Sequence, residues 1–212
     1  MSNQLCPLCG HDHLEPFHQD KKRRYERCQR CALVVVPPDF HLSGDQEKEV
    51  YDLHQNDPED MGYRRFLSRI CTPLLEMLPT RSSGLDFGCG PGPTLSVMLE
   101  EAGHNVTLFD LHYQNNPRVL TQTYDFICAT EVVEHLKQPG KVFDTLFAML
   151  KPGAPLAIMT KLVLDQKAFS TWHYTHDPTH IAFFSRETFA FIAKQYGASF
   201  RVIGNDVIVL QV

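Results

Sequence analysis

Long apolar segments are absent from this 212-residue chain. No apolar run approaches the roughly 20 residues that a helix needs to cross a bilayer. The first residues, Met1 to Leu5, also lack the basic stretch and apolar core of a secretory signal. These absences predict a cytoplasmic protein that has no membrane partner.

An excess of positive charge is absent as well. The chain has 20 Lys and Arg against 25 Asp and Glu, so its formal net charge is −5. This balance excludes the global basic field that drives non-specific nucleic-acid binding. Internal repeats and low-complexity segments are absent too, which excludes a solenoid. The hydrophobic fraction of 43% is typical of a folded globular protein rather than a disordered one.

Seven cysteines are present, and in a reducing compartment they indicate metal ligands or free thiols rather than disulfides. Cys6-x-x-Cys9 and Cys28-x-x-Cys31 form two pairs with the segment 10–27 between them, a spacing typical of a four-cysteine zinc site. Iron in a rubredoxin-like site remains an alternative, because thiolates bind both metals. The other three cysteines are predicted to be buried free thiols: Cys71, Cys89 and Cys128.

Residues 1–38 are therefore predicted to form a zinc ribbon. A module of this size buries too little core to fold alone, so the metal would hold it together. Between the cysteine pairs lies a basic run next to an aromatic residue: Lys21, Lys22, Arg23, Arg24 and Tyr25. Such a run can bind nucleic acid. The alternative is a solvated hairpin tip.

The rest of the chain alternates between helix and strand patterns. Residues 39–58 read as a polar connector with one short helix, and residues 59–212 as an α/β domain. Apolar spacing predicts helices over 63–78, 93–102, 140–150 and 185–196, and strands over 84–87, 105–109, 124–129, 155–160, 199–203 and 207–212. Alternation of this kind predicts a mostly parallel sheet covered on both faces. The last two strands flank Gly204-Asn205 and predict an antiparallel hairpin.

A glycine loop, Gly88-Cys89-Gly90-Pro91-Gly92, follows the strand that contains Asp86. Glycines let backbone amides approach a ligand where a Cβ atom would collide. The dinucleotide fingerprint requires another glycine where this chain has Pro93. The pattern instead resembles the first motif of class I S-adenosylmethionine-dependent methyltransferases.

The resemblance covers residues 84–212 and includes the Lys151-Pro152-Gly153 turn and the terminal hairpin. It implies a Rossmann-like, doubly wound, mostly parallel seven-stranded sheet, with S-adenosylmethionine as the cofactor. Asp110 would accept both ribose hydroxyls, and Tyr63 or one of its neighbours Arg64 and Arg65 would contact the cofactor carboxylate. The alternative for Tyr63-Arg64-Arg65 is an exposed basic turn. The cofactor-binding residues that the resemblance implies are Tyr63, Asp86, Gly88, Cys89, Gly90, Gly92, Asp110, Leu111, Thr130 and Glu131.

One passage departs from the family. Only the short segment 111–123 separates Asp110 from Tyr124, so the third strand would be short, at Arg118-Val119-Leu120. The acidic residue that often contacts the adenine amine is missing here. Thr121, Gln122 or a backbone group would have to serve instead.

Methyl transfer depends chiefly on in-line positioning, with a base where the acceptor carries a proton. The candidate catalytic residues are Glu131, Glu134, His135, His173 and His180. His180 is the first choice for the base or a substrate contact and His173 the second. The alternative is that Trp172 and Tyr174 pack a lid and that His180 is a hydrogen-bonded strut. A metal site of His173, His176 and His180 is a further alternative, although Pro178 interrupts the helical spacing.

The sequence thus predicts a zinc-ribbon methyltransferase, an arrangement that resembles a set of bacterial proteins. The favoured acceptor is a small molecule of carbohydrate type. One alternative is RNA, contacted through the ribbon, and another is a catalytically silent binding protein of the same fold. A nicotinamide-dependent oxidoreductase is disfavoured by Pro93 and by the terminal hairpin.

Overall fold

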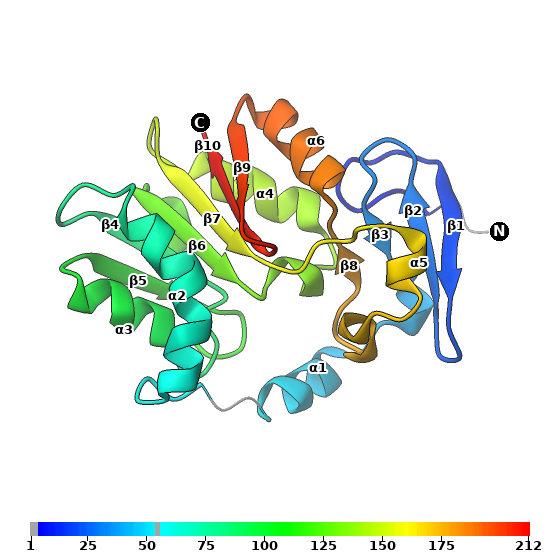
Figure 1. Ribbon diagram of the computed structural model, residues 1–212, viewed down its shortest axis with the longest axis horizontal. Helices are drawn as coiled ribbons and strands as arrows, with labels where there is room; N and C mark the ends of the chain where they lie inside the picture. The colour runs from blue at the N-terminus through cyan, green and yellow to red at the C-terminus, as the bar shows by residue number, and fades with distance from the viewer. Residues whose placement is uncertain (1–3, 54–55) are drawn as a thin grey trace.

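The computed structural model describes residues 4–53 and 56–212. Residues 1–3 of the predicted ribbon, with the start of the segment tested for a signal, and residues 54–55 of the predicted connector lie outside the described residues. The described chain forms two sheets, one of six strands and one of four. The larger sheet lies with its helices on one side of the molecule, and the smaller sheet on the other (Figure 1).

The six-stranded sheet has the order β5-β4-β6-β7-β10-β9. Its strands are β4 (Ser83–Phe87), β5 (Asn105–Phe109), β6 (Phe126–Thr130), β7 (Pro155–Met159), β9 (Ser199–Ile203) and β10 (Val207–Gln211). Parallel pairing joins β5, β4, β6 and β7, whereas β10 is antiparallel to both β7 and β9. Every residue of β7 is buried, as expected for a strand covered on both faces. The predicted mostly parallel sheet and terminal hairpin are confirmed.

Four helices cover the two faces of this sheet: α2 (Met61–Leu75), α3 (Thr94–Glu101), α4 (Pro139–Ala148) and α6 (Arg186–Tyr196). Apolar residues of α2 and α3 share one core with Phe126 and Met159. Those of α4 and α6 share the other core with Ile127 and Ile158. Because successive strand residues point to opposite faces, the two helix pairs lie on opposite sides of the sheet.

The predicted seventh strand is wrong. Residues 118–120 belong instead to a short 3-10 helix, η2 (Pro117–Thr121), so the described part of the sheet has six strands. Asn116 caps this helix by accepting the Arg118 N–H at 3.2 Å, and Pro117 supplies its first residue. The turn after Asp110 also consumes length, since Asp110 and Gln114 exchange backbone hydrogen bonds. Too few residues then remain for a helix and a strand.

The four-stranded sheet joins the N-terminal segment to a distant part of the chain. Its order is β1 (Leu14–Gln19), β2 (Arg24–Cys28), β3 (Val34–Val35) and β8 (Ala182–Phe183), all antiparallel. In β3, Val34 pairs with Phe183 and Val35 with Ala182. The N-terminal segment and the predicted methyltransferase domain therefore share a sheet. The domain boundaries at residues 38 and 58 stay predictions.

The connector forms η1 (Pro38–Phe40) and α1 (Gly44–Tyr51), which confirms the predicted short helix. Ser43 and Gln46 make a capping box that starts α1. Three further short helices lie between strands: η3 (Val133–His135), α5 (Gln166–Phe169) and η4 (His173–His176). Among the described residues, no helix is both long enough and apolar enough to cross a membrane.

Candidate functional site

A cavity of about 710 Å³ lies where β4, β5 and β6 end. This is the edge at which open parallel sheets bind ligands. All ten residues predicted to bind the cofactor line it, from Tyr63 and the glycine loop to Asp110 and Glu131. Of the five candidate catalytic residues, Glu131, His135 and His180 line it, whereas Glu134 and His173 do not.

The glycine loop needs its glycines. Gly88 has a φ of +77°, and a Cβ atom there would lie 2.4 Å from the Val132 side chain. At Gly92 a Cβ atom would lie 2.0 Å from the backbone oxygen of Asn56. Both distances are far below a normal contact, so the loop can take this path only without side chains at these positions.

Asp110 holds the turn that faces the loop. One carboxylate oxygen accepts the Gly90 N–H at 3.0 Å, and the other accepts the N–H groups of His112 at 2.8 Å and Tyr113 at 3.1 Å. Carboxylate oxygens can accept more than one hydrogen bond, so the group still has lone pairs that a ribose hydroxyl can use. The side chain therefore both shapes the site and offers acceptors to a ligand.

Two more side chains of this cavity, Asp86 and Thr130, carry buried polar groups in unusual surroundings. Asp86 is buried and accepts the Ser96 hydroxyl at 2.7 Å, and burial raises the pKa of its carboxyl to about 6. The hydroxyl of Thr130 is the one buried side-chain polar atom of the described residues that has no hydrogen-bond partner. Since buried polar groups are almost always paired, this orphan hydroxyl is available to a ligand.

The next group is a pair of carboxyls that share one tyrosine. The Tyr174 hydroxyl donates to Glu134 and lies 3.2 Å from a Glu131 oxygen, while Thr160 donates to Glu134 at 3.0 Å. Burial, and for Glu131 also the neighbouring Glu134 carboxyl, raises the pKa of both. Glu131 has a φ of +52°, a strained conformation for a side chain with a Cβ atom. This strained turn brings Glu131 into the cavity wall while Glu134 stays behind it.

His135 and His180 form a histidine pair whose ring centroids lie 4.8 Å apart. Nδ1 of His180 lies 2.7 Å from the Tyr174 carbonyl, and Nδ1 of His135 lies 3.2 Å from the Thr179 carbonyl. A carbonyl only accepts, so Nδ1 carries the proton in each ring and Nε2 is the basic nitrogen of the neutral form. Burial, followed by the nearby His135, lowers the pKa of His180 to about 4.

His173 is not part of this site. It lies on η4 with its side chain exposed, as does His176. The groups of described residues close enough to share an ion are Glu134 with His135 and His180, and the four ribbon cysteines. The alternative metal site of His173, His176 and His180 is therefore wrong, because the turn at Pro178 breaks the helical spacing that it required.

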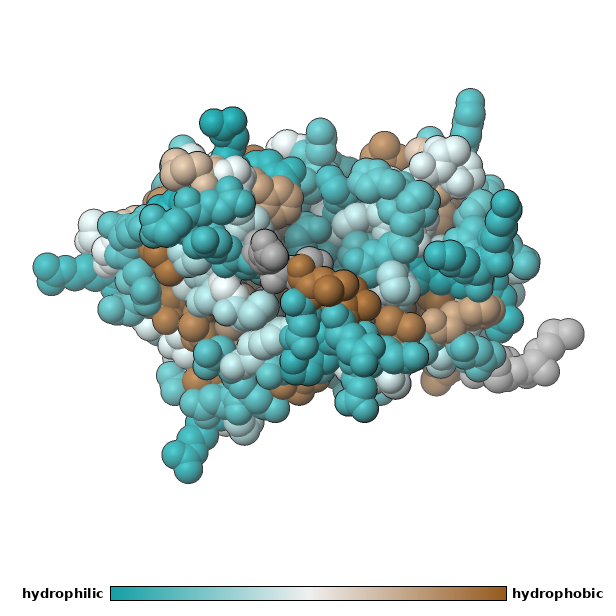
Figure 2. All heavy atoms as spheres, turned by 90° about the horizontal axis from the view of Figure 1, so that it is seen from below, coloured by the Kyte–Doolittle hydropathy of each residue, from teal (hydrophilic) through white to brown (hydrophobic). Residues whose placement is uncertain are grey.

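Helix α1 forms part of the cavity wall through Glu47 and Tyr51, which the sequence did not predict. Its Tyr51 ring lies 5.7 Å from His112 and 5.4 Å from His135, so it bridges the two ends of the cavity. Glu47 pairs with Lys137 at 2.8 Å. Figure 2, the view from below Figure 1, shows a mostly hydrophilic face with an apolar patch near its middle and smaller apolar areas toward its edges. Nothing in the local sequence of α1 signals these contacts, because every partner lies beyond Asp110, far along the chain.

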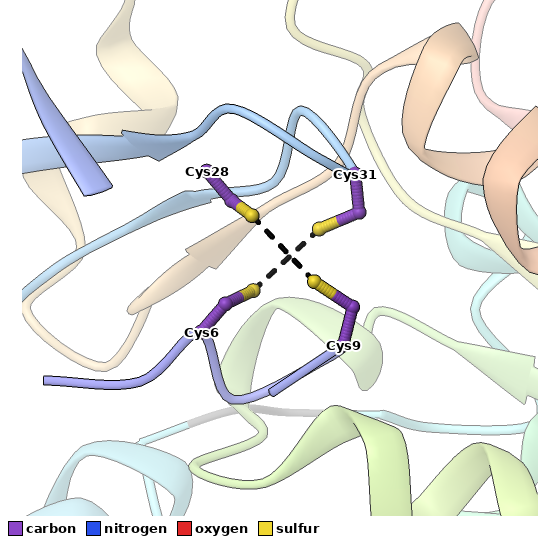
Figure 3. A group of neighbouring side chains, drawn as sticks. All are labelled: Cys6, Cys9, Cys28 and Cys31. Atoms are coloured by element: carbon purple, nitrogen blue, oxygen red, sulfur yellow. Dashed lines mark hydrogen bonds between the residues drawn. The ribbon is translucent and has the colours of Figure 1, made fainter. Parts of the chain in front are cut away.

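The four ribbon cysteines converge on one point (Figure 3). The Sγ atoms of Cys6 and Cys31 lie 3.5 Å apart and those of Cys9 and Cys28 lie 3.6 Å apart, and all four thiols are free. A tetrahedron with metal–sulfur bonds of about 2.3 Å has edges of about 3.8 Å, so the arrangement fits a four-thiolate metal site.

The basic run divides into two parts. Lys21 and Lys22 are exposed, but Arg23 is only 7% exposed and its guanidinium is bound to the protein itself. Arg24 lies over the ring of Phe40, 5.3 Å from its centroid. The interpretation of all four residues as a nucleic-acid contact is therefore wrong for Arg23.

Comparisons with known proteins agree with this geometry. A family model described as a methyltransferase domain matches residues 60–201. No curated protein matches the sequence. An O-methyltransferase family protein from Burkholderia thailandensis is similar in structure, with a TM-score of 0.52 and 14% identity over 78% of this chain. This chain spans only 62% of that protein's length.

A second similar structure is the 1,6-didemethyltoxoflavin-N1-methyltransferase of Burkholderia thailandensis, solved with its substrate and S-adenosylhomocysteine bound. The TM-score is 0.52 and the identity 15%, over 93% of this chain and 97% of that one. At such identities the likeness shows the fold alone. Since the family model matches more than half of the residues, the chain belongs to the methyltransferase domain family and has the fold of S-adenosylmethionine-dependent methyltransferases.

Proposed function

We propose that this protein transfers a methyl group from S-adenosylmethionine to a hydroxyl of a small, carbohydrate-type acceptor. The observation that carries the proposal is the single cavity with Asp110 at one end and the His135–His180 pair at the other. S-adenosylmethionine supplies a methyl group already activated by its positive sulfur. The protein's task is then to orient two ligands and to remove one proton.

The cofactor end fits this cosubstrate. The loop from Gly88 to Gly92 lines the cavity and would hold the amino-acid portion, and the unpaired Thr130 hydroxyl can satisfy one of its polar groups. Asp110 retains lone pairs for the ribose hydroxyls. Asp86 and Glu131 also line this cavity, and a cationic ligand would favour the ionised form of both carboxyls against the burial that raises their pKa.

At the acceptor end, either His180 or His135 would be the base. Both rings are held by Nδ1 donation to a carbonyl, and the lowered pKa of His180 keeps its ring neutral near pH 7. As an acceptor oxygen bonds to the methyl carbon and the carbon–sulfur bond breaks, the hydroxyl proton would pass to Nε2. Asp177, Glu47 and Tyr51 also line the cavity and supply hydrogen-bonding groups for further hydroxyls.

The ribbon would hold zinc in the same protein. Support comes from the four converging thiols and from their burial, since Cys6, Cys28 and Cys31 are each at most 2% exposed. Zinc would be structural here, because four thiolates leave no open coordination position. Iron remains the alternative ion, and metal analysis of the purified protein separates the two.

Two alternatives have different support. RNA as the acceptor loses Arg23, which is bound within the protein, although Lys21 and Lys22 remain exposed. A catalytically silent binding protein is favoured by one observation, the replacement of the third strand by η2 beside the predicted adenine pocket. Binding of S-adenosylhomocysteine with no product from any acceptor would support that reading.

The test is transfer of labelled methyl from S-adenosylmethionine to a panel of neutral sugars, nucleotide-linked sugars, phenols, amines and bulk tRNA. We expect label on a sugar hydroxyl. Replacing the base, His180→Ala or His135→Ala, should reduce turnover by roughly 10² to 10⁴, the usual contribution of a general base. The control is His13→Ala, whose side chain is exposed on the ribbon. Label on tRNA only, or unchanged turnover in both variants, would exclude this mechanism.

A further inference from the structure

Arg23 is a buried cation that the methyl-transfer chemistry does not use. Its guanidinium donates to the carbonyls of Thr175 at 2.6 Å, Asp177 at 2.8 Å and Pro178 at 3.2 Å, and its Nε donates to the Tyr25 hydroxyl at 2.9 Å. Burying a charge is costly unless it is fully hydrogen-bonded. Four bonds from a single side chain, three of them to one short loop, mark a built contact.

The ribbon side of this contact is rigid. Asp20 accepts the backbone N–H groups of Lys22 and Arg23 and the Tyr25 hydroxyl, all between 2.6 and 2.8 Å. The Tyr25 ring is fully buried, with ring centroids 5.0 Å from Phe169 and 5.8 Å from Phe183. The base of the Arg23 side chain is therefore fixed by strand β2 and by the turn that precedes it.

The loop side leads into the cavity. Asp177 contributes its carbonyl to Arg23 and also lines the cavity wall. His180, further along the same loop, donates its backbone N–H to that same Asp177 carbonyl at 3.3 Å. The next residue, Ile181, donates its N–H to Glu134 and accepts the N–H of Val36 at the end of the ribbon. Arg23 thus lies behind the two loop residues that face the acceptor.

We propose that Arg23 is a positioning residue for the acceptor end of the cavity. It clamps the loop 175–178 to the ribbon and so sets the placement of Asp177 and His180. The assignment of this end of the cavity to the acceptor rests on the proposed function, whereas the contacts of Arg23 with the loop do not depend on it. Its loss should disturb the His180 side of the cavity and leave the cofactor side intact, because the hydrogen bonds of Arg23 go to the ribbon and to this loop and not to the glycine loop or Asp110.

The experiment compares Arg23→Met with Arg24→Met, the same change at the next residue, which is exposed and begins β2. Diethyl pyrocarbonate acylates neutral imidazoles, and mass spectrometry reports the rate at each histidine. His180 is 7% exposed, so it should react slowly in the native protein. We expect its rate to rise about tenfold or more in Arg23→Met, as for loss of at least one charge-assisted hydrogen bond. The rate at exposed His13 should stay constant in both variants.

A second readout comes from Trp172, the only tryptophan of the chain, which caps η4 just before this loop. Its ring packs 5.0 Å from Tyr174 and 6.0 Å from Phe183. In Arg23→Met its emission should shift to the red, while Arg24→Met leaves it unchanged. Arg23→Lys keeps the charge but loses the planar guanidinium with its several N–H donors. Its Trp172 emission should lie between that of the native protein and that of Arg23→Met.

Calorimetric titration with S-adenosylhomocysteine separates positioning from general damage. We expect its affinity in Arg23→Met to stay close to the native value. A native His180 rate in Arg23→Met would overturn the proposal, and so would loss of S-adenosylhomocysteine binding in parallel with the rise in that rate. If Arg23→Met does not fold, Tyr25→Phe removes one clamp partner and should give a smaller change of the same sign. Failure of the native protein to bind S-adenosylhomocysteine would count against the proposed function without touching the clamp.

Discussion

The two ends of the cavity are built in different ways. At the cofactor end, the glycine loop, Asp110 and Thr130 lie at the ends of neighbouring strands of one sheet, and short local hydrogen bonds shape the site. At the acceptor end, α1, the Glu131–Lys137 segment and the loop 174–180 come from distant parts of the chain. The ribbon then holds that loop from behind. The cofactor end is thus built mainly at neighbouring strand ends of one sheet, whereas the acceptor end is assembled from separate segments of the chain.

Metal removal should have the largest effect of the changes considered. It should disturb the acceptor end much more than the cofactor end if the two ends are independent. Structural zinc contributes roughly 10 kcal/mol or more in isolated zinc modules. We therefore expect Cys28→Ser to lose the metal, to lower the unfolding temperature by many degrees and to shift Trp172 emission. Affinity for S-adenosylhomocysteine should fall much less. The control is Cys71→Ser, a buried thiol outside the cluster. An equal loss of ligand affinity and loop order would show that the two ends are one cooperative unit.

Asp110→Ala should disturb the cofactor end and leave the acceptor end unchanged. It removes the acceptor for three backbone N–H groups and, under the proposed function, for the ribose hydroxyls. We expect S-adenosylhomocysteine affinity to fall about 100-fold, which corresponds to about 3 kcal/mol. Trp172 emission and the His180 acylation rate should stay native. Asp125→Ala is the matched control, because that carboxylate pairs with Lys151 outside the cavity. Calorimetry that finds the same affinity in both variants would remove Asp110 from the site.

Asp86→Asn should have a smaller effect, on the pH dependence of stability and on ligand binding at the cofactor end. Burial raises the pKa of this carboxyl to about 6 from 3.8, so the folded protein prefers the neutral acid. Ionisation then destabilises the fold progressively as the pH rises from about 4 to 6, and the full cost, about 3 kcal/mol, persists above pH 6. Asparagine avoids that cost. We expect the variant to be more stable than the native protein at pH 8 and close to it at pH 4.

Urea unfolding at the two pH values measures this difference, with Asp125→Asn as the control. The same Asp86→Asn change should weaken binding of cationic S-adenosylmethionine more than binding of neutral S-adenosylhomocysteine. A variant that is less stable than the native protein at pH 8 would mean that Ser96 and Cys128 stabilise the ionised carboxylate more than burial penalises it.

The same contrast explains what the sequence could predict. Hydrophobic periodicity placed α2 and α6 close to their observed bounds, and the glycine loop with Asp110 was found because each feature lies within one short segment. The Glu131–Tyr174–Glu134 bridge joins residues at least 40 positions apart and carries no local signal. Charge alone classed Arg23 with its exposed neighbours, since its burial depends on carbonyls more than 150 positions away.

The short segment between Asp110 and Tyr124 correctly indicated a departure from the family, but the strand predicted there was wrong. A shortened strand and a 3-10 helix both satisfy the available length. Asn116 as a cap and Pro117 at the first helical position favour the helix. These two residues were the local signal that could have identified η2.

The pairing of β3 with β8 also constrains how the chain reaches its final form. The four ribbon cysteines all precede the large sheet in the sequence, so the proposed metal could be captured before that sheet has been synthesised. The free edge of Val34-Val35 must then wait for Ala182-Phe183, which comes near the other end of the fold. Pairings of such long sequence separation are slow to form, and unpaired apolar edges promote association between chains. Until β8 is available, the β3 edge of the N-terminal segment would therefore stay open to pairing with other chains.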